Sequence, residues 1–241
     1  AGFAERINFM TIGNMKHAPN LDSVRWLQGG LWRKIRKRVK ELDGGEPELH
    51  IYGAYMADHD KSWSSRNAPG LVMCGKADSL DCLDGYRVLL APLRFGAGVK
   101  GKITDSWWHG MPVCSTAVGV EGMFGVGEEP ASSELIGSQV DWGGLYSGLS
   151  EDQFADNAAK LYTSQEMREK CTAIGGAILE DRFSENVGTE LVQEVASLIN
   201  DPDGVALMRQ QDPVGAVLWH SQFKSTEYFS KWLEMKESQA S

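Results

Sequence analysis

The pattern of hydrophobic and polar positions predicts short strands that alternate with helices over the first 140 residues. The apolar runs are short and lie between clusters of turn residues, which favours buried strands over helices. A short final strand is expected just before the chain becomes helical. The predicted strands cover residues 7–13, 48–55, 71–75, 86–92, 113–119 and 138–140.

The segment between the first two strands carries apolar residues at the spacing of an amphipathic helix. Its basic run RKIRKRVK, residues 33–40, falls mostly on the face opposite the apolar stripe. We interpret this basic face as solvated. The alternative is that it attracts an anionic membrane surface and makes the protein peripheral to a membrane. The stripe consists of Val24, Leu27, Leu31, Ile35 and Val39.

The alternation of strands and helices indicates an α/β fold, a Rossmann-like doubly wound parallel sheet of about six strands. We expect this domain to cover residues 1–200 and a helical C-terminal extension to cover residues 201–241. Ligands of such sheets bind at the carboxyl ends of the strands, so the site is expected in the loops at that edge. The later helices are expected at residues 151–163, 164–180, 184–200 and 214–237.

Composition narrows the class of protein. The formal net charge of −9 argues against general nucleic-acid binding, which needs a basic surface. The sequence has no run of roughly 18–20 apolar residues that would predict a membrane span. The cysteines show no C-x-x-C spacing and the histidines no metal-ligand spacing, so we expect neither a disulfide framework nor a metal site. A cytoplasmic protein is expected, and the abrupt start suggests a segment of a longer one.

The most informative stretch is RFGAGVKGKITDSWWHGMPV, residues 94–113. Gly96, Gly98 and Gly101 match the G-x-G-x-x-G of dinucleotide-binding folds, which would indicate an NAD(P)-dependent oxidoreductase. That motif normally occupies the first strand-to-helix turn, whereas three predicted strands precede it here. The dinucleotide interpretation is therefore disfavoured.

Two other interpretations of this stretch involve phosphate. Gly96, Gly101 and Lys102 come close to a P-loop, but Ile103 stands where a hydroxyl must reach Mg²⁺. The other interpretation is an anion clamp, in which a glycine loop leads into the unpaired amides of a helix N-terminus. We favour the clamp because it needs no residue that the sequence lacks.

Charged residues follow the glycine loop at helical spacing. Lys100 and Lys102 are two residues apart and cannot share one helix face, and we expect Lys102 to reach the phosphate. Asp105 lies about one turn beyond Lys102, where a carboxylate suits hydrogen bonds to ribose hydroxyls. Amides, a lysine and a carboxylate in this order predict a nucleoside diphosphate.

This stretch, with IGNMKHAPNLDSVRWL, LHIYGAY and GVEGM, resembles the C-terminal donor-binding domain of GT-B glycosyltransferases of the retaining group 1 family. The resemblance runs from about residue 7 to residue 200. It implies that residues 1–200 bind a nucleotide-sugar donor of UDP or GDP type, without a cofactor or a required metal. It also implies an acceptor of unknown identity and an N-terminal GT-B domain, which this sequence does not supply.

The resemblance also implies roles for individual residues. Asp105 matches the second acid of the family's E-x7-E motif, which binds the ribose, and the base would lie near Gly75. Lys16, in the first strand-to-helix loop, is either a phosphate contact or a solvated lysine. The implied donor-binding residues are Gly13, Asn14, Lys16, Gly75, Gly96, Ala97, Gly98, Val99 and Asp105.

Two features depart from the family pattern. Ala97 stands where the first E-x7-E acid should contact the donor sugar. Glu121 is a candidate to replace that acid, and the alternative is a carboxylate that caps a turn. Trp107 and Trp108 stand where the family has small residues, and we expect both to pack rather than to stack on a sugar.

The sequence thus predicts the donor-binding half of a glycosyltransferase of the hexosyltransferase type, with Lys102, Lys100 and Glu121 as catalytic residues. Catalysis would consist of positioning and of neutralising the departing diphosphate. The alternative is a non-catalytic nucleotide-binding or interaction module of the same fold, which Ala97 favours.

Overall fold

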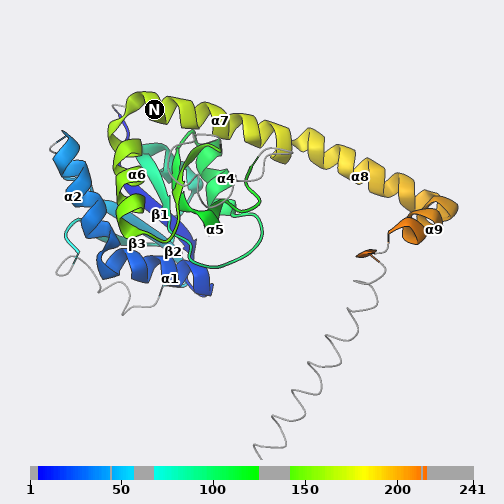
Figure 1. Cartoon of the computed structure of the whole chain (residues 1–241), viewed down its shortest axis with the longest axis horizontal. Helices are drawn as coiled ribbons and strands as arrows, with labels where there is room; N and C mark the ends of the chain where they lie inside the picture. The colour runs from blue at the N-terminus through cyan, green and yellow to red at the C-terminus, as the bar shows by residue number, and fades with distance from the viewer. Residues whose placement is uncertain (1–4, 44, 57–67, 125–141, 213, 216–241) are drawn as a thin grey trace, which may run out of the picture. The chain divides into compact units, whose positions relative to one another are not determined.

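Six parallel strands form one sheet in the computed structural model (Figure 1). The structure describes residues 5–43, 45–56, 68–124, 142–212 and 214–215. The chain divides into two compact units, Ala1–Ser184 and Glu185–Ser241, and the sheet belongs to the first. The strands are β1 (Ile7–Asn14), β2 (Leu49–Ala54), β3 (Leu71–Gly75), β4 (Tyr86–Ala91), β5 (Val113–Thr116) and β6 (Gly144–Ser147).

The strand order is β3-β2-β1-β4-β5-β6, so the chain proceeds from β1 toward one edge and then restarts beside β1 with β4. Helices connect the strands and complete the first unit. They are α1 (Ala18–Trp26), a π-helical turn η1 (Leu27–Leu31), α2 (Trp32–Asp43), a 3₁₀ helix η2 (Leu80–Gly85), α4 (Gly101–Trp108), α5 (Ala117–Val120), α6 (Glu151–Thr163) and α7 (Gln165–Phe183).

Both faces of the sheet are covered by apolar clusters, as parallel sheets require. One cluster joins the sheet to α1, α2 and α6, and the other joins it to α4, α5 and α7. The predicted stripe lies in the first cluster, where all its members are buried. The fold class predicted from the sequence, a Rossmann-like doubly wound parallel sheet, is therefore confirmed.

Some predicted boundaries are wrong, and one predicted strand is not tested. The sixth strand of the described sheet is β6, whereas residues 138–140, predicted as a strand, lie outside the described residues. The strand predicted to continue to residue 119 ends at Thr116, whose hydroxyl accepts a hydrogen bond from the Gly119 amide at 3.2 Å and so caps α5. The helix expected from Val99 begins at Gly101.

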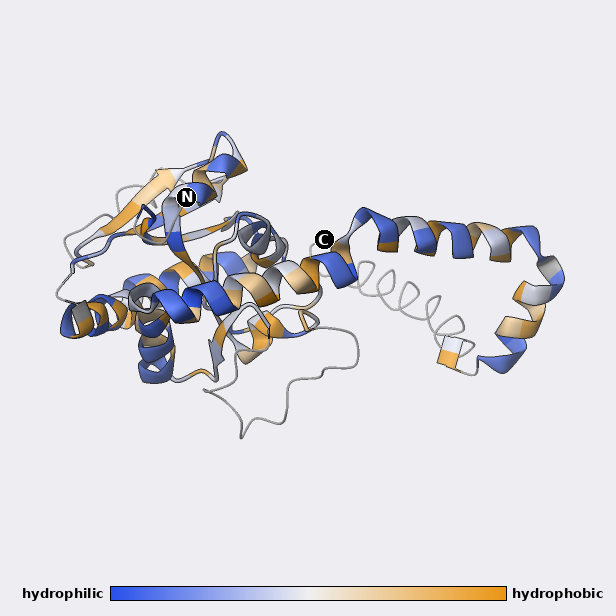
Figure 2. Cartoon of the chain, turned by 90° about the horizontal axis from the view of Figure 1, so that it is seen from above, coloured by the Kyte–Doolittle hydropathy of each residue, from blue (hydrophilic) through white to orange (hydrophobic). Residues whose placement is uncertain are grey.

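The second unit contains α8 (Glu185–Asn200) and α9 (Pro202–Gln211). Figure 2 shows apolar and polar residues mixed along both helices. The sequence predicted α8 but not α9, and most of the tail helix expected at 214–237 lies outside the described residues. The division of the chain at residue 200 by function stays a prediction.

Carboxylates neutralise the basic face of α2. Exposed pairs of this kind contribute little to stability, but they lower the positive potential that an anionic surface would attract. The solvated interpretation fits these contacts. Among the described helices, none is both long and apolar enough to cross a bilayer. The ion pairs join Lys34 with Glu151 and Asp152, Arg36 and Lys40 with Glu46, Lys37 and Arg38 with Glu41, and Arg38 with Asp156.

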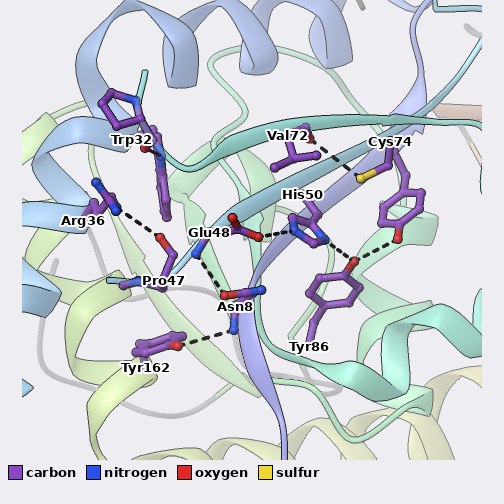
Figure 3. A network of polar contacts seen from close by, with 12 residues as sticks. Asn8, Trp32, Arg36, Pro47, Glu48, His50, Val72, Cys74, Tyr86 and Tyr162 are labelled. Atoms are coloured by element: carbon purple, nitrogen blue, oxygen red, sulfur yellow. Dashed lines mark hydrogen bonds and ion pairs between the residues drawn. The ribbon is translucent and has the colours of Figure 1, made fainter. Parts of the chain in front are cut away.

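A polar network joins β1, β2 and β4 near their amino ends (Figure 3). The ring nitrogens of His50 lie 2.7 Å from the Tyr86 hydroxyl and 3.0 Å from the Glu48 carboxylate. The Tyr86 hydroxyl also lies 2.8 Å from that of Tyr52, and burial raises the pKa of Tyr86. Asn8, in the left-handed region at φ 62°, accepts a hydrogen bond from the Glu48 amide at 2.9 Å. The network links these three strands at their amino ends, on the side of the sheet away from the carboxyl ends where ligands bind.

The two adjacent tryptophans of α4 have different environments. Trp107 is 3% exposed and donates its indole hydrogen to the Gly143 carbonyl at 2.9 Å. Its ring lies so close to α7 that a Cβ added at Gly175 would be 2.7 Å away. Trp108 is 79% exposed, so the expectation that both rings pack is confirmed for Trp107 and wrong for Trp108.

Because of this close approach, we expect Gly175→Ala to destabilise the protein by about 1–3 kcal/mol, the usual effect of overpacking. Gly176→Ala is the matched control, since a Cβ there meets no atom within 4 Å and should stabilise the helix by up to about 1 kcal/mol. Urea denaturation of the two variants measures the difference. Equal stability of the two would contradict the close packing of Trp107 on α7.

Candidate functional site

The carboxyl ends of β1 and β4 lie side by side because these two strands are hydrogen-bonded neighbours. The chain leaves β1 toward β2 and leaves β4 toward β5, so the two following loops diverge at this point. Doubly wound sheets bind ligands at such switch points. The glycine loop follows β4 and therefore begins here, as the sequence predicted.

Buried hydroxyls fix the first residues after β4. Ser23 of α1 donates a hydrogen bond to the Pro92 carbonyl at 2.9 Å. The Thr116 hydroxyl at the end of β5 donates to the Leu93 carbonyl. Buried carbonyls need such partners, and these two bonds attach the base of the loop to the elements on both sides of it.

Arg94 attaches the same loop to α1. Its guanidinium makes two hydrogen bonds to the Asp22 carboxylate, at 2.8 and 2.5 Å, and lies 5.3 Å from the Trp26 ring centroid. This guanidinium lowers the pKa of Asp22. The bidentate pairing fixes geometry as well as charge, so the loop leaves this anchor in one direction.

The glycine loop itself is exposed. Gly96 and Gly98 have φ angles of 125° and 77°, a region that side-chain-bearing residues rarely adopt. Ala97, which lies between the two glycines, and Val99, which follows them, are exposed. The loop therefore presents its backbone to solvent just before α4.

Lys100 is the N-cap residue of α4 and folds back under this loop. Its ammonium donates a hydrogen bond to the Gly98 carbonyl at 2.6 Å, and the residue is 9% exposed. Burial lowers the pKa of Lys100, and the negative charge of Glu121 partly offsets that effect. Glu121 is exposed at the C-terminal end of α5.

Lys102, in the first turn of α4, reaches across to α1. Its ammonium donates to the side-chain oxygen of Asn20 at 2.7 Å, and the Asn20 amide nitrogen donates to the Asn14 carbonyl at 3.0 Å. The Asn20 side chain occupies the space that a Cβ on Gly13 would fill, 2.7 Å away. One chain of contacts therefore joins the end of β1 to the start of α4.

Burial lowers the pKa of Lys102 to about 8. Removing an ammonium from water disfavours its charged form unless an opposite charge compensates. Here the partner is a neutral amide rather than a carboxylate. The folded chain thus holds a cation that gains from the approach of an anion.

Other predicted residues lie farther from this centre. Gly75 ends β3, which β2 separates from β1. The Lys16 ammonium lies 4.3 Å from the ring centroid of Tyr55, at the end of β2. Asp105 lies one turn beyond Lys102, and burial raises its pKa while His109 partly counteracts this. The structure thus brings Gly13, Asn14 and Lys102 together through Asn20, holds Lys100 against the Gly98 carbonyl, and leaves Gly75 and Lys16 on the β2 side.

The sequence did not identify Asn20, Asp22 or Arg94 as site residues. Asn20 and Lys102 are 82 positions apart, and no local pattern links them. The described residues contain no group of three or more His, Cys, Asp or Glu arranged to hold a metal ion.

A family comparison agrees with this architecture. The sequence profile described as "Glycosyl transferases group 1" matches residues 6–164, which is more than half of the chain. The chain belongs to the group 1 glycosyltransferases. No curated protein sequence matches it at a significant level.

Solved structures show the same fold for this glycosyltransferase chain. A mutant of S. aureus TarM in complex with fondaparinux, α-GlcNAc-glycerol and UDP is 13% identical with a TM-score of 0.54, over 81% of this chain and 36% of TarM. Anabaena HepE in complex with UDP and glucose is 9% identical with a TM-score of 0.55, over 81% of this chain and 50% of HepE. A glycosyltransferase from Rickettsia africae is 12% identical with a TM-score of 0.53, over 81% and 48%. This chain therefore spans about a third to a half of these proteins and has the fold of one Rossmann-like half.

The lowered pKa of Lys102 predicts a pH-dependent stability. Between pH 8 and 10.5 the unfolded chain still binds a proton that the folded chain has released, so stability rises with pH across this window. Below pH 8 the full penalty of burying the charge remains. The contribution of Lys102 to this rise should be on the order of 3 kcal/mol.

Comparison with Lys102→Met isolates this contribution, since methionine carries no charge. Unfolding free energies of the two proteins at pH 7 and pH 10 should converge or cross, with the variant favoured at pH 7. A difference that stays constant with pH would mean that the Lys102 ammonium is solvated in the folded chain.

Proposed function

We propose that this group 1 glycosyltransferase chain is the donor-binding half of the enzyme and holds the diphosphate of a nucleotide sugar between β1 and α4. The observation that carries the proposal is Lys102, a partly buried cation with a neutral partner, placed beside an exposed glycine backbone. Such a group favours an anionic ligand, because the ligand restores the stabilisation that the ammonium lost with its water.

The loop backbone and the start of α4 support the same ligand. No side chain caps the N-terminus of α4, so its first amides remain for a phosphate, and the helix dipole adds to the attraction. The glycines at 96 and 98 allow close approach to the backbone. Asp105, one turn farther along, is our candidate for the ribose hydroxyls.

In the proposed reaction, these groups neutralise the negative charge that develops on the departing nucleoside diphosphate. Lys102 and the α4 amides would contribute mainly electrostatic stabilisation, and the fixed loops would contribute positioning. UDP accompanies TarM and HepE in their solved complexes. We extend a UDP- or GDP-type donor to this chain, and retention of configuration on the basis of its family.

Ala97 leaves the exposed loop without the acid that the family pattern places on the donor sugar. Glu121 is our candidate for that role, because it is exposed and its charge acts on Lys100 beneath the loop. The acceptor would bind in the other half of a GT-B enzyme. The non-catalytic alternative retains the same nucleotide site and differs only in lacking sugar transfer.

Nucleotide binding tests the proposal. We expect UDP or GDP to stabilise the chain against thermal unfolding, by about 2.7 kcal/mol at a hundred times its Kd. Lys102→Met should weaken this binding by tenfold or more, equivalent to about 1.4 kcal/mol. Lys37→Met, on the exposed face of α2, is the matched control and should bind like the wild type.

The result that would overturn the proposal is stabilisation by NAD alone, or UDP and GDP binding that Lys102→Met leaves intact. If nucleotides bind but the enzyme that contains this half transfers no sugar, the non-catalytic module is the correct function.

A further inference from the structure

Asn20 lies at the centre of the candidate site, although nothing in the family pattern of the sequence marks it. It occupies the first turn of α1 and contacts two separate elements through the two ends of its side-chain amide. The oxygen accepts from the Lys102 ammonium at 2.7 Å, and the nitrogen donates to the Asn14 carbonyl at 3.0 Å.

These two contacts fix the orientation of the amide. A carbonyl accepts only, so the nitrogen of Asn20 must face Asn14, and an ammonium donates only, so the oxygen must face Lys102. Rotation of the amide by 180° would break both hydrogen bonds. The Asn14 carbonyl therefore positions Asn20, and Asn20 in turn positions the ammonium.

We propose that Asn20 is a positioning residue for donor binding, which holds the Lys102 ammonium beside the glycine loop where the diphosphate of a nucleotide sugar arrives. The inference rests on the proposed function. It adds to that function the residue that orients the Lys102 ammonium, and it explains why this residue is an asparagine.

The reason lies in the neutrality of the amide. A carboxylate at position 20 would also hold the ammonium, but it would compensate the positive charge and repel a diphosphate. An asparagine supplies the hydrogen bond and leaves the charge available to the ligand. The short side chain of asparagine also loses less conformational freedom when it is fixed than the longer side chain of glutamine would.

The surrounding charges do not take over this role. On α1, Asp22 is paired with Arg94, and beyond the loop Glu121 acts on Lys100. Asp105 lies on the same helix as Lys102. Burial lowers the pKa of Lys102, and the contact with Asn20 determines where the ammonium lies.

Gly13 provides an independent way to disturb the contact. A Cβ at this position would lie 2.7 Å from the Asn20 side chain, so Gly13→Ala displaces the amide without altering its chemistry. If Asn20 positions Lys102, displacement and removal of the amide must act in the same direction.

Proton uptake gives a readout that a purely structural role would not affect. A diphosphate favours the charged form of Lys102, so binding above pH 8 must return a proton to it. The affinity of the wild-type chain for UDP should therefore fall about tenfold between pH 7 and pH 9. Phosphate oxygens do not interfere, because their last pKa is near 6.

The experiment is isothermal titration of UDP, with GDP as the second probe, at pH 7, 8 and 9. Asn20→Ala should bind UDP at least several-fold more weakly at pH 7. As the pH rises, its affinity should begin to fall at a lower pH than that of the wild type. Gly13→Ala should behave alike. Asn20→Asp should bind about tenfold more weakly at pH 7, by charge competition, and show a flat profile up to pH 9 because the carboxylate raises the pKa of Lys102.

Two controls complete the set. Asn186→Ala, at an exposed position of α8, should reproduce the wild-type affinity and pH profile. Lys102→Met should remove the pH dependence, and adding Asn20→Ala to it should cause little further loss of affinity, since the two residues act through one contact.

Nuclear magnetic resonance of isotope-labelled lysine provides the ligand-free measurement, with Lys102 assigned by comparison with Lys102→Met. The titration midpoint of Lys102 should fall in Asn20→Ala and rise in Asn20→Asp. Unchanged midpoints, or variants that lose stability but keep the wild-type pH profile, overturn the inference and leave the proposed function standing. A wild-type chain that binds neither nucleotide overturns the proposed function, even when the midpoints shift.

Discussion

The pairing of β1 with β4 is the constraint on which the candidate site depends. These strands are parallel neighbours, although 71 residues separate the end of one from the start of the other. Their adjacency places the Asn14 carbonyl across from the glycine loop and the first turn of α4, which carries Lys102. Hydroxyls from α1 and β5 then bind the loop's first carbonyls, and the Asp22–Arg94 pair fixes its direction. The exposed backbone that follows is consequently held from both sides rather than left as a free turn.

The same arrangement explains why the site holds a cation that is unfavourable for folding. Burial lowers the pKa of Lys102 to about 8, so the folded chain would be more stable at neutral pH without the charge. A carboxylate partner would relieve this penalty, yet the contact is an amide. An electrostatic penalty of this kind is typical of ligand sites, where the ligand supplies the missing stabilisation. The chain is thus less stable than it could be at the point where an anion is expected.

Features that depend on local pattern could be predicted from the sequence. Burial selects apolar residues, so the strands appear in the sequence as apolar runs and the buried stripe of α1 and α2 as apolar residues at helical spacing. The position of the glycine loop then follows from the order of the strands. The β6 segment GLYS is too short, and too poor in β-branched residues, to stand out. The prediction that Trp108 packs is wrong because adjacent helix positions face about 100° apart. Trp107 is therefore buried while its neighbour Trp108 is exposed. Asn20 could not be identified at all, since its contact with Lys102 exists only after β1 and β4 pair.

The contacts also distinguish the two lysines, which the sequence could separate only by helix geometry. Lys100 donates to the Gly98 carbonyl under the loop, and the charge of Glu121 acts on it. Its charge is therefore partly balanced within the protein, and its side chain supports the loop. Lys102 has a neutral partner in Asn20 and no charged neighbour that shifts its pKa. Of the two, Lys102 gains more from an arriving diphosphate, while Lys100 stabilises the glycine backbone that the diphosphate would contact.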